Sequence, residues 1–233
     1  GGGGGGGGGG AITEGSKGTM HRIVRRPEGR WTIAVVVAVA LLLGSIFLPL
    51  WQMNLKAPQY PKGLLMYAYG YKFADNPRTT YNDINEISNL NHYIGMKPIK
   101  KVAEMNVFLP GVAALALLAL ASTVVGWQKR LVRLLVVGGF WFAVLFFLAD
   151  LQYWLYRYGH DLDPQAPIRT STFTPKLVGS LKVWNFTVET NFAPGFYLLL
   201  GAALAITLLP PALGTLKTWV RQRLGRRALT AVP

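Results

Sequence analysis

Four long apolar runs constrain the fold of this 233-residue chain more than any other feature of its sequence. At 1.5 Å per helical residue, about 20 apolar residues cross the roughly 30 Å hydrocarbon layer of a bilayer. Each run is long enough, or nearly so, and soluble proteins rarely carry four of them in so short a chain. We therefore predict an all-α membrane protein with four transmembrane helices. The predicted spans are residues 31–51, 105–127, 134–158 and 194–214.

The segments beside the spans fall into two groups by charge. The two tails and the link between spans two and three hold 13 Lys/Arg and only two acids. The two long loops, counted with the adjoining turns of span three, hold 11 Lys/Arg and eight Asp/Glu. Because cytoplasmic segments beside spans carry excess Lys and Arg, we predict cytoplasmic termini and periplasmic loops in a bacterial inner membrane. The segments are the tail 1–30, the loop 52–104, the link 128–133, the loop 159–193 and the tail 215–233.

The basic residues next to the cytoplasmic span ends are interpreted as topology signals that also attract anionic lipid, rather than as a nucleic-acid site. The expected partner of these residues is therefore the lipid bilayer. The ten glycines that open the sequence predict no packed structure. The arginines assigned to lipid and topology are Arg25, Arg26, Arg130, Arg226 and Arg227.

Both long loops are expected to be ordered and packed together, because their many aromatic residues would otherwise form exposed apolar patches. Asp83 followed by Glu86 has the spacing of a capping box, and apolar residues then recur at helical spacing. We therefore predict a short amphipathic helix over residues 84–94, ended by Gly95. Span three is expected to continue beyond the bilayer toward Gly159.

His92 and Met96 in "NLNHYIGM" stand four residues apart, so a helix would place them on one face. His160 follows span three as His92 precedes span two, which makes it the candidate third ligand. Thioether and imidazole ligands without thiolate suit copper, and the chain has no cysteine. Asp161 and Asp163 could accept hydrogen bonds from ligating imidazoles. Every histidine and methionine other than Met20 and His21 maps to the predicted outer side or to the outer end of a span: Met53, Met66, His92, Met96, Met105 and His160.

The alternative interpretation of "NLNHYIGM" is structural. In it His92 hydrogen-bonds within a polar loop, Met96 packs on the membrane surface, and no metal binds. Asp150, the only acid close to a span, is expected to form a structural ion pair with Arg157, two helical turns away. The spans lack the facing histidines that b-type haem needs, and the sequence shows no nucleotide-binding loop and no nucleophile–base pair. We therefore expect a protein that is not an enzyme.

Several outer-loop strings resemble a family of four-span bacterial membrane proteins. They are "PLWQMNLKAPQYPKGL", "DINEISNLNHYIGMKPI", "YRYGHDLDPQAPI" and "FTPKLVGSLKVWNF". Members of this family are often encoded near accessory genes for nitrous oxide reductase, a copper enzyme. The resemblance implies a part in periplasmic copper delivery, but it assigns no role to any residue.

These observations lead to two hypotheses about function. The first is a membrane-anchored accessory protein for periplasmic copper handling that supports assembly of a copper enzyme. The second is a non-catalytic structural subunit of a larger membrane complex of the respiratory, oxygenase or photosynthetic kind. In both, the loops would meet a membrane or periplasmic protein partner.

Overall fold

The computed structural model describes residue 1 and residues 29–77, 82–124, 129–183 and 185–229. Four of its helices are long and apolar enough to cross a membrane. This is the pattern of a polytopic membrane protein in contact with lipid. The helices are α1 (Gly29–Phe47), α3 (Glu104–Val124), α4 (Lys129–His160) and α5 (Pro194–Leu229).

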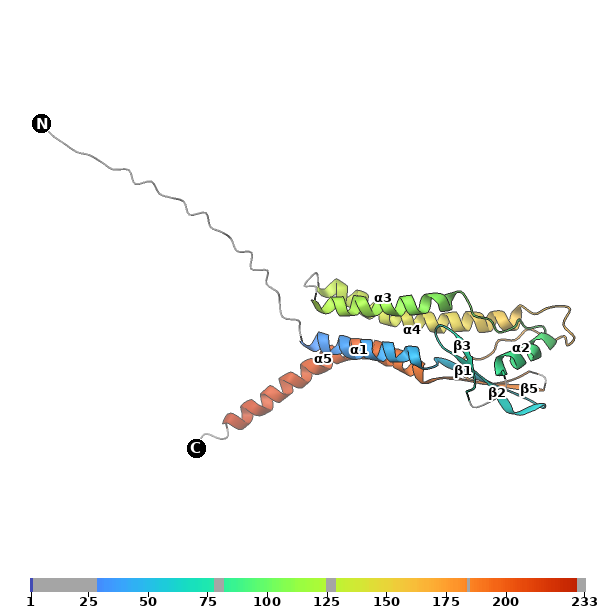
Figure 1. The fold of residues 1–233 in the computed structure, drawn as a ribbon. Helices are drawn as coiled ribbons and strands as arrows, with labels where there is room; N and C mark the ends of the chain where they lie inside the picture. Colours follow the sequence, from blue (N-terminus) through green and yellow to red (C-terminus); the bar gives the residue numbers. More distant parts are fainter. Residues whose placement is uncertain (2–28, 78–81, 125–128, 184, 230–233) are drawn as a thin grey trace.

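The four long helices form two side-by-side pairs, α1 with α5 and α3 with α4 (Figure 1). Their shared core is apolar and includes the fully buried Phe140 and Leu199. Two tryptophans also join helices through hydrogen bonds between side chains. Trp31 Nε1 donates to Ser122 Oγ at 3.0 Å, and Trp141 Nε1 donates to Thr207 Oγ1 at 3.1 Å. The apolar side chains exposed around the outside of the helices are suited to lipid.

The expectation of an all-α fold is wrong, because the two long loops build one five-stranded antiparallel sheet. The strand order is β3-β2-β1-β5-β4. Alternate residues of the strands face the two sides of the sheet, so short strands can bury an apolar face without a long apolar run. The strands are β1 (Trp51–Ala57), β2 (Tyr60–Ala68), β3 (Phe73–Asp75), β4 (Gly179–Val183) and β5 (Phe186–Phe192).

The centre of the sheet joins the two loops directly, which confirms that the loops pack together. Strand β1 from the first loop pairs with β5 from the second, with Trp51 opposite Phe192 and Leu55 opposite Val188. β1 begins a few residues after α1 ends, and β5 ends just before α5 begins. The central strand pair therefore continues the α1–α5 helix pair out of the membrane-spanning region (Figure 1).

The predicted short helix is present as α2 (Asp83–Tyr93), although its cap differs from the expected one. Asn82 is the N-cap residue, and its side chain accepts a hydrogen bond from the Asn85 backbone N–H at 3.2 Å. Asp83 is instead buried and accepts from the Leu65 N–H of β2 at 3.0 Å. The capping-box spacing therefore located the helix, while tertiary contact with the sheet took the Asp83 carboxylate.

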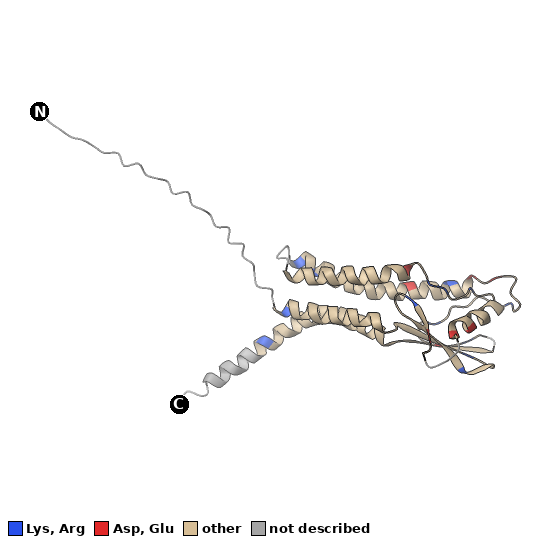
Figure 2. Cartoon of the chain, in the orientation of Figure 1, with Lys and Arg blue, Asp and Glu red and all other residues tan. Residues whose placement is uncertain are grey.

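The acids of the described residues gather at one end of the molecule, whereas basic residues occur at both ends. Figure 2 shows the acids of the described residues at the end that carries the sheet. Three basic residues belong to the ends of long helices away from the sheet: Arg30 at the start of α1, Arg130 at the start of α4 and Lys217 in the later part of α5. The side chains of Arg226 and Arg227 lie outside those that the structure describes, as do Arg25 and Arg26.

Candidate functional site

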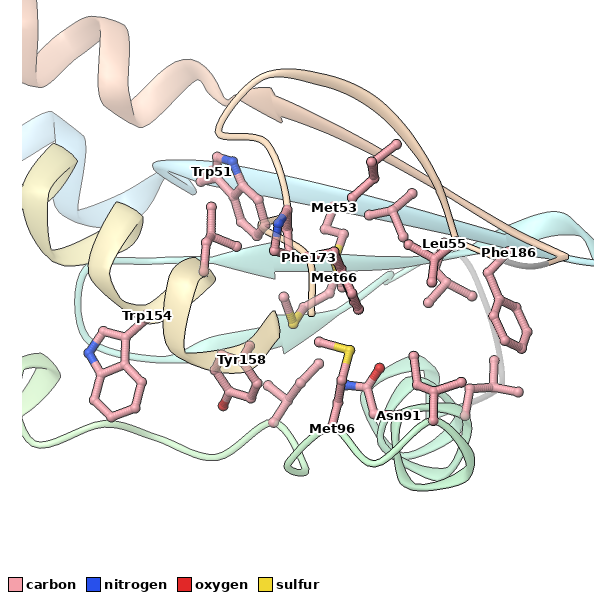
Figure 3. A pocket seen from close by; sticks show the side chains of 18 of the residues that line it. Trp51, Met53, Leu55, Met66, Asn91, Met96, Trp154, Tyr158, Phe173 and Phe186 are labelled. Carbon is pink, nitrogen blue, oxygen red and sulfur yellow. The ribbon is translucent and has the colours of Figure 1, made fainter. Parts of the chain in front are cut away.

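An apolar cavity of about 110 Å³ lies between the inner face of the sheet, helix α2 and the end of α4 (Figure 3). Its lining within the described residues is almost wholly carbon and sulfur. Asn91 is the one amide side chain in this lining, and no histidine, carboxylate, lysine or arginine takes part. Among its walls are the side chains of Trp51, Leu55, Phe173 and Phe186.

Two adjacent strands place two methionines on the wall of this cavity. Met53 of β1 and Met66 of β2 are direct partners in the antiparallel ladder. Directly opposed residues of such a pair lie on the same face, about 4.5–5.5 Å apart at their Cβ atoms. Met66 is 4% exposed and Met53 is half-buried. The register of a single hairpin therefore brings together two thioethers that are far from adjacent in sequence.

A third methionine, Met96, reaches the cavity from the end of α2. The chain reverses at Gly95, whose φ of 80° lies in the left-handed region that glycine adopts without strain. The Met96 N–H then donates to the Asn91 carbonyl oxygen at 2.8 Å, which fixes the start of the next segment. In Figure 3 the Met53 and Met66 side chains project from the sheet and Met96 projects toward them from the opposite wall.

A strap formed by residues 173–177 closes one side of the cavity. Trp51 Nε1 donates to the Leu177 carbonyl oxygen at 2.7 Å, and Thr190 Oγ1 donates to that of Lys176 at 2.8 Å. At the other end of the strap, the Phe173 N–H donates to the Gly159 carbonyl oxygen at 3.1 Å. Two buried donors on the sheet and one carbonyl acceptor near the end of α4 thus hold the strap in place.

Helix α4 supplies the remaining wall because it is longer than a membrane span. Its 32 residues extend about 48 Å, against roughly 30 Å of hydrocarbon. The helix is therefore longer than one span needs, and its last turns pack beside the sheet. Leu151, Trp154, Leu155 and Tyr158 of these turns line the cavity.

Of the three expected metal ligands, only Met96 lines the cavity. His92 is exposed on α2, and its ring lies beside that of Tyr93, with centroids 6.5 Å apart. The His160 ring stacks on Tyr156 at 3.9 Å, and its Nδ1 lies 3.0 Å from the Tyr156 carbonyl oxygen. Within the residues that the structure describes, no three histidine, aspartate or glutamate side chains gather as a metal site.

The expected acceptors for imidazole have other partners. Asp161 forms ion pairs with Lys97 and with Arg157, the latter at 3.1 Å between Nη2 and Oδ2. The hydrogen bond from Lys97 and that from Arg157 lower the pKa of Asp161 below its ordinary value, so this carboxylate is ionised at neutral pH. Asp163 Oδ1 accepts from the Gln165 N–H at 2.9 Å within a turn.

Arg157 pairs with Asp161 in place of the expected partner Asp150. The reason is helical geometry, because residues four apart are surface neighbours, whereas Asp150 lies two turns and about 10 Å away. The Arg157 guanidinium also lies over the rings of Tyr153 and Trp154, 5.9 and 5.8 Å from their centroids. Arg157 is therefore held at the end of α4 that carries the sheet.

The sequence prediction assigned Met53 and Met66 to the outer side of the membrane but gave neither a role as a ligand. The signal that could have identified Met53 is the alternation of apolar and polar residues in "WQMNLKA", which predicts a strand with methionine on its apolar face. Met66 lies in the short apolar run "GLLMYA", which is consistent with a second strand but does not say which face is buried. Among known proteins, no family model and no curated protein matches the chain. The resemblance based on the outer-loop strings therefore remains a prediction.

Proposed function

We propose that this chain is a membrane-anchored accessory protein for periplasmic copper handling, with Met53, Met66 and Met96 as the ligands for Cu(I). One observation carries the proposal: three of the four methionines in the described part of the chain line a single cavity. The positive-inside pattern, from which we expect the sheet to be periplasmic, supports it further. So does the absence of cysteine from the sequence, because methionine keeps its ligand form where thiols would oxidise.

The chemistry of the cavity favours one kind of metal ion. Thioether sulfur is a soft, neutral ligand that suits Cu(I), whereas harder divalent ions prefer imidazole and carboxylate. Transfer of a charge into an apolar site is costly, and the cost is far greater for a double charge than for a single one. The indole of Trp51 can offset part of it, since aromatic faces attract cations. The cavity therefore selects a soft monovalent ion.

The same features suit a protein that passes its metal onward. Three neutral ligands leave the positive charge of the ion uncompensated, so the ion is held less firmly than by thiolates. Met96 is the mobile member of the set in this proposal, because it stands after the end of α2 whereas Met53 and Met66 belong to the sheet. Movement of the segment after Gly95 would open the site toward a recipient protein.

Anaerobic loading of the purified full chain with Cu(I), in competition with a Cu(I) chelator, tests the function. We expect one retained Cu(I) per chain and an X-ray absorption spectrum with sulfur neighbours at about 2.3 Å, by analogy with zinc–thiolate bonds. A spectrum dominated by imidazole nitrogen would return the site to His92 and His160. Failure to retain Cu(I), or equal retention of Zn(II), would refute copper handling.

The second hypothesis, a structural subunit of a larger membrane complex, is favoured by exposed tyrosines at the end of α2 and on the last turns of α4. Tyr93, Tyr153 and Tyr156 each expose about half of their surface, at 53%, 51% and 51%. Tyrosine is enriched at protein interfaces, where its ring is buried and its hydroxyl finds a partner.

This hypothesis predicts a stable partner in native membranes. After gentle solubilisation, the chain should migrate with another protein, and Tyr93→Ala/Tyr156→Ala should release that protein without reducing Cu(I) retention. Migration of the parent chain at the size of its own detergent complex would argue against a structural subunit.

A further inference from the structure

A second hollow, the basic pocket, lies beside the methionine cavity and has the opposite character. It encloses about 450 Å³ between residues 97–103, which lead into α3, and the last turns of α4. Four of its lining residues are cations and only one, Asp161, is an acid. The cations are Lys97, Lys100, Lys101 and Arg157.

The one acid does not neutralise this pocket. Asp161 is shared between Lys97 and Arg157. Lys100 and Lys101 are exposed, and neither has an ion-pair partner in the part of the chain that the structure describes. With four positive charges and one negative charge, the pocket has a net charge of about +3. Two free ammonium groups beside a guanidinium suit a phosphate group.

The pocket also lies at the depth of lipid headgroups. The apolar part of α4 ends at Asp150, and Trp154 and Arg157 stand about 6 and 10 Å further along the helix axis. The headgroup layer adds about 5–7 Å to each side of the hydrocarbon, so Trp154 lies within this layer. Arg157 lies just beyond it, and its long side chain can reach back to the headgroups. From the other side of the pocket, Lys101 precedes the first residue of α3, Glu104, by three positions. Trp154 and Tyr158 form part of the wall, as aromatic residues commonly do at a membrane surface.

We propose that the basic pocket binds the phosphate group of an anionic phospholipid from the adjoining leaflet. Lys100 and Lys101 contact the phosphate, and Arg157, fixed by Asp161, closes the site from α4. Trp154 and Tyr158 line both this pocket and the methionine cavity. A bound lipid therefore packs against the same two rings that form a wall of the cavity. Lipid binding at the basic pocket does not require copper in the methionine cavity.

The test compares lipid retention by the full chain in nanodiscs of phosphatidylcholine with a small fraction of phosphatidylglycerol. The variant Lys100→Gln/Lys101→Gln removes the two unpaired charges. The matched control, Lys62→Gln/Lys182→Gln, removes two exposed lysines from the sheet. Because a lysine near an anionic surface contributes about 1 kcal/mol, the pocket variant should bind phosphatidylglycerol about tenfold to thirtyfold more weakly than the parent, measured by native mass spectrometry.

Three outcomes would overturn the proposal. Equal retention by the parent and the pocket variant would show that the pocket holds no lipid. An equal loss in the control would reveal general attraction of the basic chain to the membrane instead of a site. Displacement of phosphatidylglycerol by millimolar inorganic phosphate would make this a site for free phosphate ion.

Discussion

Replacement of all three cavity methionines by leucine, Met53→Leu/Met66→Leu/Met96→Leu, should abolish Cu(I) retention while the protein stays folded. Leucine and methionine have similar volumes, and such exchanges usually cost less than about 1.5 kcal/mol each. Loss of a residue that merely orients a metal ligand weakens binding about 10–100-fold, so removal of every sulfur ligand should weaken it by at least about 100-fold. Chelator competition under anaerobic conditions measures the change.

Two control variants test whether Cu(I) binds at the methionine cavity or elsewhere on the chain. Met105→Leu removes a thioether that lies on α3 outside the cavity lining, and it should leave Cu(I) retention unchanged. His92→Ala/His160→Ala should also retain Cu(I), because neither imidazole reaches the cavity wall. If the double histidine variant loses Cu(I) and the triple variant Met53→Leu/Met66→Leu/Met96→Leu keeps it, the methionine site is refuted.

The substitution Gly159→Ala should displace the strap of residues 173–177 and destabilise the packing between α4 and the five-stranded sheet. In most helices this exchange stabilises the protein, since glycine costs up to about 1 kcal/mol relative to alanine. At Gly159, however, an added Cβ would overlap the Phe173 carbonyl oxygen and lie 2.8 Å from its carbonyl carbon. The obstacle is backbone, which cannot rotate away as a side chain can. We expect a loss of about 1–3 kcal/mol in the free energy of unfolding, typical of overpacking.

Intrinsic tryptophan fluorescence during chemical unfolding in mild detergent measures this loss, since Trp51 donates to the strap at Leu177. Limited proteolysis of the strap should accelerate in the same variant. Gly138→Ala is the matched control, because it lies on the same helix with nothing within 4 Å of the added Cβ. Equal stability of the two variants would mean that the strap does not depend on its close approach to Gly159.

The parts of the fold that sequence predicted well are those with local signals. A long apolar run identifies a membrane span without knowledge of its neighbours, and α2 carried its own cap and period. The sheet lacked such a signal. Its central pair joins residues of the two loops across α2, α3 and α4, and β1 begins at Trp51, within the predicted first span. Pairing over such a distance depends on how the loops meet, which periodicity does not report.

The candidate site divides in the same way. Of the residues that the sequence singled out as candidate ligands, Met96 lines the cavity. Its expected companion His92 is exposed, and the two side chains do not share a face because α2 ends at Tyr93 and Gly95 redirects the chain before Met96. The i, i+4 rule holds only while a helix continues. Met53 and Met66 come together through hairpin register, which helical spacing does not predict.

The pairing of β1 with β5 also constrains the order in which the protein can assemble. β1 leaves the ribosome early, whereas β5 follows only after α2, α3 and α4 have been made, on the order of ten seconds later at ~5–20 residues per second. Until then, β1 has an unpaired edge, and such edges readily recruit foreign strands. The cavity also lacks Val188 of β5 during this interval. The site proposed for Cu(I) is therefore complete only in chains whose second loop has joined the sheet, so that incomplete chains carry no finished site.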